Sequence, residues 1–357
     1  MAQTEVKPMK EKNQVSETVI HSILQIYGMD AAFSGQREYI SYSGEGGDDL
    51  VKVILSVLLE KGKRVVIKLL REQDDLNKER TKIEKQSAFS EFMRQRGIKT
   101  TMRYMANGRY CNEYIYNGRL CHVTIEDWCG NEIMQINEDV AYKIGALMAR
   151  MHTLSLMNNC EIGCGTLFSA AYWNDVDSFQ DFCEITENEN LDQRIVAQIK
   201  KLHDEKLEAI RNVWGTLPKA AVQGDLSINN LVYGEKELTV FDYNNAGDEV
   251  LISDLVMEGL LTAYEMDMPE KADSNDREKI FPAMLNGYLS IRKLSEEEAN
   301  AAWLVYTLYH ALWFTRVVYK DGSLQKLVER ADHAGANRLL VQMLADMMEK
   351  DDGRFRR

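Results

Sequence analysis

The chain has 357 residues, enough for two domains or lobes, and 45% of them are hydrophobic. Its formal net charge of −13 argues against a nucleic-acid partner, because no basic stripe offsets the repulsion from phosphate. Six cysteines in a chain of this length do not indicate a disulfide framework.

The sequence carries no signal for export or membrane insertion. Residues 1–14 are polar and lack the hydrophobic core of a signal peptide. No run approaches the roughly 18 apolar residues that a membrane-spanning helix requires. We therefore expect a cytoplasmic protein with no membrane partner; the sequence leaves its oligomeric state open.

The first 130 residues predict a small sheet with one or two helices. Hydrophobic residues recur at helical spacing over residues 15–27 and again over residues 76–96. The intervening and following runs are rich in β-branched and aromatic residues, which predicts strands at 38–43, 50–59, 64–70, 102–105, 110–116 and 120–128.

The rest of the chain predicts a mainly helical part. Helical patterns cover residues 139–152, 176–183, 191–211, 252–266, 276–289, 295–319 and 323–350. Gly145 lies within the first of these helices and predicts close packing against a neighbouring helix. Pro282 should start or kink its helix, because proline lacks a backbone N–H group.

Residues 221–254 interrupt this helical pattern with strand-like runs. Residues 231–233 and 238–241 read as two strands joined by a Gly-Glu-Lys-Glu turn. Asp225 and Asn230 stand just before the first strand, and Asp242 stands just after the second. Two carboxylates and an amide are therefore expected at the ends of one small sheet.

This grouping suits phosphoryl transfer, which needs positioning and charge neutralisation more than covalent chemistry. Asp225 is the candidate group for accepting the proton of an attacking hydroxyl. Asn230 and Asp242 offer the oxygen ligands that Mg²⁺ prefers. The alternative is that all three are ordinary turn residues. Their joint spacing and the flanking strands favour the first interpretation.

The arrangement resembles the catalytic loop and metal-binding aspartate of the aminoglycoside phosphotransferase and choline kinase superfamily. That pattern is His-Gly-Asp, four residues, Asn, and then a strand ending in Asp. The chain has Gln223-Gly224-Asp225, Asn230 and Asp242, so Gln223 stands in place of the histidine. Asp254 matches the acidic residue that follows the metal aspartate in the family. The resemblance covers roughly residues 37–320.

The resemblance implies an α+β, bilobal, protein-kinase-like fold. A tail and a helix (1–36) would precede a small antiparallel β N-lobe (37–130) that binds the nucleotide. A larger, mainly helical C-lobe (131–357) would carry the catalytic and substrate-binding residues. Helix 139–152 resembles the helix that supports the catalytic loop in this family, and we expect His152 to be a structural hydrogen-bonding residue there.

The resemblance also implies an ATP site in the N-lobe. Lys68 would bind the α- and β-phosphates and pair with a glutamate of helix 76–96. Glu79, Glu84 and Glu91 are the candidates, and we choose Glu84 because it lies near the middle of the helix. The implied backbone contacts to the nucleotide come from the glycine-rich turn and the hinge, namely Gly44, Gly46, Gly47, Glu126, Asp127 and Trp128.

Together these features predict Mg²⁺- and ATP-dependent phosphorylation of a small-molecule hydroxyl. An aminoglycoside, an amino alcohol, homoserine or a sugar would each suit as the acceptor. No Ala-Pro-Glu segment separates the hairpin from Asp254, which argues against a protein kinase. The alternative is a nucleotide-binding regulatory protein of the same fold that has lost catalysis, and Gln223 is its main support.

Overall fold

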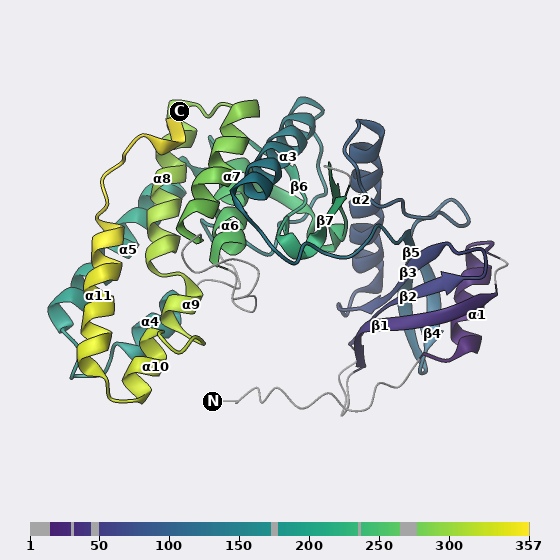
Figure 1. Ribbon diagram of the computed structural model, residues 1–357, viewed down its shortest axis with the longest axis horizontal. Coiled ribbons are helices and arrows are strands. Elements are labelled where there is room, and N and C mark those ends of the chain that lie inside the picture. The colour runs from purple at the N-terminus through teal and green to yellow at the C-terminus, as the bar shows by residue number, and fades with distance from the viewer. Residues whose placement is uncertain are drawn as a thin grey trace. The chain divides into compact units, whose positions relative to one another are not determined.

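The computed structural model shows a chain that forms two compact units, Met1–Gly130 and Asn131–Arg357 (Figure 1). The residues that the structure describes are 15–29, 32–43, 50–172, 178–234, 237–264 and 277–356.

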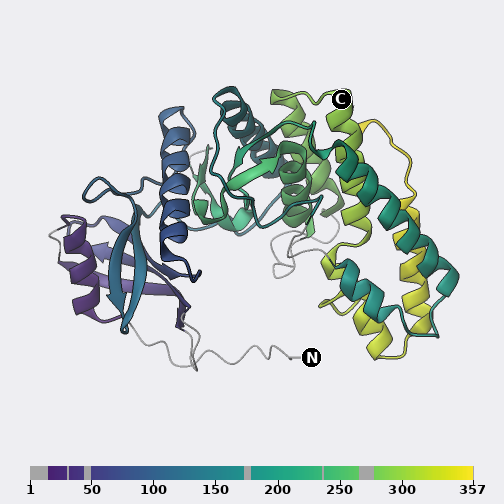
Figure 2. The same cartoon turned by 180° about the vertical axis from the view of Figure 1, so that it is seen from behind.

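The first unit is built on a five-stranded antiparallel sheet with the strand order β1-β2-β3-β5-β4 (Figures 1 and 2). The strands are β1 (Phe33–Ser43), β2 (Val51–Leu59), β3 (Arg64–Arg71), β4 (Asn112–Tyr116) and β5 (Arg119–Asp127). The strand expected at 102–105 is absent; there, Arg103 forms only an isolated bridge with Glu126.

The two faces of this sheet differ because side chains alternate along each strand. Val65, Ile67 and Leu69 of β3 are buried in a core shared with helix α1 (Glu17–Ile26). Lys68 has the opposite parity and therefore lies on the other face of the sheet. Helix α2 (Leu76–Gln95) begins at Asp75, whose side chain accepts the backbone N–H groups of residues 77 and 78.

In its described residues, the second unit is mainly helical and contains two short antiparallel pairs of strands. Its helices are α3 (Glu138–Met157), α4 (Phe179–Ile185), α5 (Gln193–Trp214), α6 (Leu251–Tyr264), α7 (Arg277–Ile291), α8 (Glu296–Ala311), α9 (Phe314–Val317), α10 (Leu324–Glu329) and α11 (His333–Met347). Strand β6 (Lys219–Val222) pairs with β9 (Gly247–Val250), and β7 (Leu231–Gly234) pairs with β8 (Glu237–Val240).

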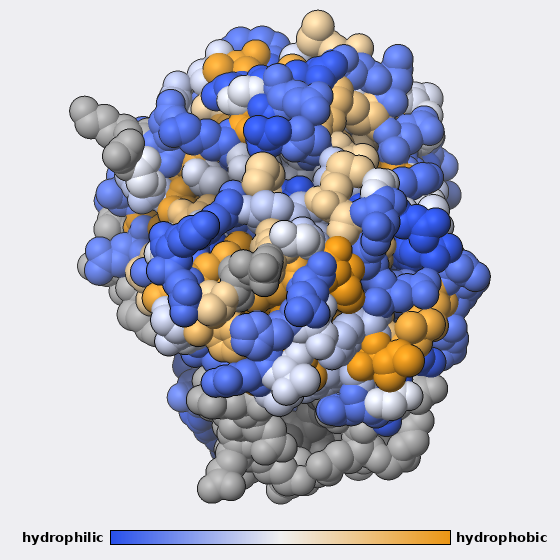
Figure 3. Space-filling view, turned by 90° about the vertical axis from the view of Figure 1, so that its right-hand side faces the viewer, coloured by the Kyte–Doolittle hydropathy of each residue, from blue (hydrophilic) through white to orange (hydrophobic). Residues whose placement is uncertain are grey.

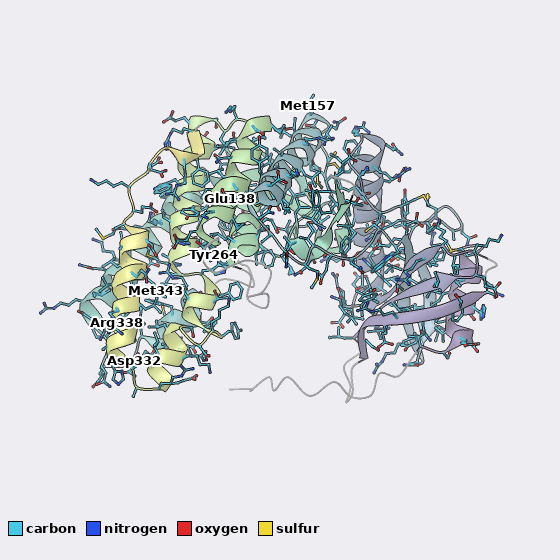
Figure 4. The ribbon with its side chains drawn as sticks, viewed as in Figure 1. Glu138, Met157, Tyr264, Asp332, Arg338 and Met343 are labelled. Carbon is cyan, nitrogen blue, oxygen red and sulfur yellow. The ribbon has the colours of Figure 1, made fainter. Side chains whose placement is uncertain are left out.

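Helices α3 and α7 lie side by side in both ribbon views, and Figure 4 labels the two ends of α3, Glu138 and Met157. A Cβ atom on Gly145 of α3 would lie 1.8 Å from the carbonyl oxygen of Met284. One on Gly287 of α7 would lie 1.9 Å from the carbonyl oxygen of Tyr142. The two glycines therefore permit direct contact between the two helix backbones, and the prediction made from Gly145 is confirmed.

Two helices expected from the sequence are each split in two. The helix expected at 295–319 breaks after α8, where Trp313 leaves the helical conformation (φ −56°, ψ 134°) and the hydroxyl of Ser178 donates to the carbonyl oxygen of Leu312 (2.5 Å). The helix expected at 323–350 breaks after α10, where Ala331 has a positive φ of 58°. No glycine marks that second break, so the helical pattern of the sequence does not predict it.

Within the described residues, no helix combines the length and the hydrophobicity needed to cross a membrane. Hydrophilic side chains predominate on the face shown in Figure 3, where hydrophobic ones form small separate patches.

Candidate active site

Gln223 joins the two segments that carry the predicted catalytic aspartates. Its Nε2 donates to the backbone carbonyl of Asp242 (2.8 Å), and its Oε1 accepts the backbone N–H of Asp225 (2.8 Å). The side chain is buried, with 2% of its surface exposed. The glutamine therefore braces the loop after β6 against the segment after β8.

Asp225 is held by two asparagines from different parts of the chain. Asn230 Nδ2 donates to the backbone carbonyl of Asp225 (2.8 Å), and Asn245 Nδ2 donates to its carboxylate Oδ2 (2.9 Å). Hydrogen bonds that end on a charged group are stronger than neutral ones. The contact from Asn245 therefore fixes the orientation of the Asp225 carboxylate.

Asn230 and Asp242 lie at the same end of the β7–β8 hairpin. Leu231 pairs with Val240 in the strand register, and the backbone N–H of Phe241 donates to the carbonyl of Asn230 (3.0 Å). Asp242 itself has a left-handed backbone (φ 54°) and begins the short 3-10 turn Tyr243–Asn245. This turn brings Asn245 back to Asp225.

The loop requires glycine at position 224. Gly224 has φ +74°, and a Cβ atom there would lie 2.6 Å from the backbone oxygen of Asn245 and 2.9 Å from Cγ2 of Thr166. A larger residue would push the Asp225 loop away from the turn that follows Asp242.

A buried histidine of α3 joins this helix to α6 and α7. His152 Nε2 lies 2.9 Å from Asp254 Oδ2, and its Nδ1 lies 2.9 Å from the hydroxyl of Tyr288. Burial raises the pKa of the Tyr288 hydroxyl, so it stays protonated. On the same helix, Ser155 donates to the carbonyl of Ala221 in β6 (2.6 Å). These contacts agree with a structural role for His152.

Glu249 of β9 is a buried carboxylic acid beside the same loop. It accepts hydrogen bonds from the Thr166 hydroxyl (3.2 Å) and from the backbone N–H of Val250 (2.7 Å). Burial raises the pKa of Glu249 to about 7, and the nearby Asp254 acts in the same direction. Thr166, whose hydroxyl contacts Glu249, therefore lies close to the Asp225 loop at Gly224.

The first unit places Lys68 in a buried ion pair, with 3% of its surface exposed. Its Nζ lies 2.9 Å from Oε1 of Glu126, on the neighbouring strand β5. The prediction that Glu84 pairs with Lys68 is therefore wrong. Glu84 accepts the backbone N–H groups of Cys111 (2.7 Å) and Tyr110 (3.3 Å), so its carboxylate caps the chain before β4.

The two other candidate glutamates of α2 are also bound elsewhere. Glu79 accepts the backbone N–H of Glu72 (2.7 Å), and Glu91 pairs with Arg94 on the surface of the helix (2.7 Å).

The predicted hinge residues close β5 and follow it. Trp128 donates its backbone N–H to the carbonyl of Arg64 (3.1 Å), and its ring stacks on Tyr39 of β1 at 5.7 Å. Asp127 pairs with Lys63 (3.0 Å). Adenine recognition by the backbone here stays a prediction. The predicted phosphate-contacting glycines, Gly44, Gly46 and Gly47, lie outside the described residues.

The oxygen donors of Asn230 and Asp242 fit Mg²⁺. This ion is commonly held by one or two protein carboxylates, with water and substrate phosphates completing its shell. Among the described residues there is no group of three or more His, Cys, Asp or Glu side chains that could hold a metal by itself.

Sequence reasoning missed Asn245, Arg103 and the pairing role of the Glu126 side chain. Asn244 and Asn245 read as turn residues, and no spacing rule indicates that the side chain of Asn245 hydrogen-bonds to Asp225. The strand expected around Arg103 does not form, so its spacing offers no sign of the contact with Glu126.

No family model and no curated protein matches the sequence. Solved structures do match it. A microcompartment-associated aminopropanol kinase has a TM-score of 0.60 at 16% identity, covering 94% of this chain and 99% of its own. The amicoumacin kinase hAmiN, in complex with AMP-PNP, Ca²⁺ and Ami, has a TM-score of 0.53 at 12% identity, covering 92% and 93%.

Similarity at these identities shows the fold, over nearly the whole length of both chains. The five-stranded antiparallel sheet and the helical second unit agree with the predicted α+β, kinase-like architecture. The chain has the fold of these two kinases.

Proposed function

We propose that this protein transfers the γ-phosphoryl group of ATP to a hydroxyl of a small molecule. The observation that carries this proposal is the Asp225 carboxylate, oriented by Asn245 and placed beside a hairpin end that presents Asn230 and Asp242. An ordinary turn does not need an aspartate whose carboxylate is held by a side chain from another segment, as Asn245 holds Asp225 here.

In the proposed reaction the acceptor oxygen forms a bond to the γ-phosphorus while the bond to the leaving ADP oxygen breaks. Asp225 orients the acceptor hydroxyl and accepts its proton. Asn230 and Asp242 would hold Mg²⁺, which neutralises phosphate charge when bound. Lys68, kept in place by Glu126, would bind the phosphates of the nucleotide.

The names of the two similar structures support a small acceptor. One is an aminopropanol kinase and the other an amicoumacin kinase, so this fold serves small-molecule kinases. We propose the same class of acceptor here, an aminoglycoside, amino alcohol, homoserine or sugar, for an enzyme acting in the cytoplasm.

The rival proposal, an inactive nucleotide-binding regulator, rests on Gln223. The glutamine makes hydrogen bonds to both aspartate segments, so the loop does not lose its brace with the change from histidine. The observation favours the active enzyme.

The roles of Asp225 and Asp242 can be distinguished by measuring Mg·ATP binding and turnover in variants of each. Asp242→Asn should lose both turnover and the Mg²⁺-dependent part of ATP binding. Asp225→Asn should keep Mg·ATP binding within about twofold and lower turnover by about 10²–10⁴-fold, the usual contribution of general acid–base catalysis. Calorimetric titration of Mg·ATP and ADP release with a panel of hydroxyl compounds measure the two quantities.

Asp248→Asn is the matched control. That carboxylate accepts the backbone N–H groups of Ile162 and Gly163 (2.7 and 2.6 Å), so its loss should lower stability without separating binding from turnover. Reversed effects at 225 and 242 would refute the assigned roles. ATP binding with no turnover of any acceptor, in the natural protein as well, would favour the regulator.

A further inference from the structure

Four buried polar side chains of the first unit form a continuous path from β3 to α2. Lys68 pairs with Glu126 Oε1 (2.9 Å), and Arg103 Nε donates to Glu126 Oε2 (3.0 Å). Arg103 Nη1 then donates to the hydroxyl of Ser87 on α2 (2.8 Å). The exposed fractions of Lys68, Glu126, Arg103 and Ser87 are 3%, 2%, 6% and 0%.

Arg103 is held in place by its backbone as well as by its side chain. It forms an isolated β-bridge with Glu126, and the hydrogen bonds of this bridge are made by the residues on either side of the pair. The N–H of Tyr104 donates to the carbonyl of Ile125, and the N–H of Asp127 donates to the carbonyl of Met102 (both 2.9 Å). A planar guanidinium on a fixed backbone can bond a carboxylate and a hydroxyl at once, which the ammonium of lysine matches poorly.

The Glu126 carboxylate is therefore shared between two cations, one on each oxygen. A carboxylate bound to Lys68 alone would draw that ammonium toward itself and compete with an anionic ligand for it. Sharing with Arg103 weakens this competition while keeping the Lys68 side chain in one place. The same arginine connects the pair to α2, although the glutamates considered on that helix are bound elsewhere.

We propose that Arg103 is a positioning residue for the nucleotide phosphates, acting through Glu126 on Lys68. This inference rests on the proposed function, because it assumes that Lys68 binds phosphate. In this proposal Arg103, which lies outside the sheet, and Glu126, on β5, together orient the phosphate-binding Lys68.

The test compares Mg·ATP with adenosine, which lacks the phosphates. In the full-length protein, Arg103→Met should weaken Mg·ATP binding at least about tenfold, the size expected of a lost hydrogen bond between charged groups. Adenosine binding should change less than about twofold. The Mg·ATP affinity of Arg103→Lys should lie between those of the unaltered protein and Arg103→Met, since lysine keeps the positive charge but lacks the planar guanidinium that bonds both partners.

The double variant Arg103→Met/Glu126→Gln separates positioning from packing. With the competing carboxylate removed, Mg·ATP should bind more tightly than to Arg103→Met alone. A double variant that binds more weakly, by the sum of the two single losses, would overturn the role of Glu126. Equal losses for Mg·ATP and adenosine in Arg103→Met would make Arg103 a packing residue only.

The remaining outcomes are also decisive. If Arg103→Met does not fold, Arg103→Lys replaces it in the test. The affinity for Mg·ATP relative to that for adenosine is then compared with the same ratio in the unaltered protein, and an unchanged ratio overturns the inference. If the unaltered protein binds Mg·ATP normally and Lys68→Ala does too, phosphate binding by Lys68 fails, and the inference fails with it. If the unaltered protein binds neither ligand, the proposed function itself is wrong.

Discussion

Asn245 offers the sharpest test of the site, because the structure assigns it one contact with the reacting group. Its Nδ2 donates to Asp225 Oδ2 at 2.9 Å. A hydrogen bond to a charged group contributes about 1.5–3 kcal/mol. If that energy holds the carboxylate in its reactive orientation, Asn245→Ala should lower kcat by about 10–100-fold. The KM for ATP should stay nearly constant, because Asn245 contacts the proposed base.

Asn245→Asp should act differently, because it places a second carboxylate within hydrogen-bonding distance of Asp225. Two adjacent carboxylates cannot both ionise easily, so the pKa of the pair rises. Asp225 must be ionised to accept a proton, and the acidic limb of the kcat–pH profile should therefore move to higher pH. The assay is ADP release at saturating Mg·ATP and acceptor, across the pH range.

The exchanged pair Asp225→Asn/Asn245→Asp is the control for stability. It keeps an amide facing a carboxylate, so the thermal midpoint should stay close to that of the natural protein, while turnover should be lost because the carboxylate stands at the wrong position. Unchanged kcat in Asn245→Ala, or an unshifted pH profile in Asn245→Asp, would refute the assignment of Asn245 as the residue that orients Asp225.

Two further predictions concern stability. The pKa of Glu249 is raised to about 7 by burial, so the folded state keeps a proton that the unfolded state loses above its ordinary value of 4.5. The free energy of unfolding should therefore fall between about pH 4.5 and 7, by at most about 3 kcal/mol, and level off above that range. Urea unfolding at pH 5 and 7.5 measures this fall, which should be smaller in Glu249→Gln than in the unaltered protein. Gly145→Ala should lower stability by about 1–3 kcal/mol, because its Cβ would meet the backbone of Met284, whereas Gly215→Ala, with open space around it and an ordinary φ of −71°, should be nearly neutral. Chemical denaturation of both glycine variants checks this, and equal stabilities would contradict the direct contact between α3 and α7.

The sequence predicted the parts of the protein that depend on local rules. The runs of β-branched and aliphatic residues over β2 and β3 predicted these two strands, and Lys68 stood out as a charged residue within such a run. The spacing of Asp225, Asn230 and Asp242 around a hairpin predicted the candidate site, because a short hairpin limits where its ends can lie. Gly145 marked a close helix contact, since a glycine inside a good helix costs stability unless something else needs the space.

The tertiary structure alone decided which groups meet across long separations in the chain. Lys68 pairs with Glu126 on an adjacent strand, although α2 offers several glutamates with suitable spacing. Periodicity gives the face of a helix but not its rotation and height against a sheet, and those two quantities select the partner. Asn245 reaches Asp225 through a left-handed residue at Asp242, a backbone conformation that no neighbouring glycine marks. Such contacts arise from packing of the whole unit, where small rotations of rigid elements bring one side chain within 3 Å and leave another beyond reach.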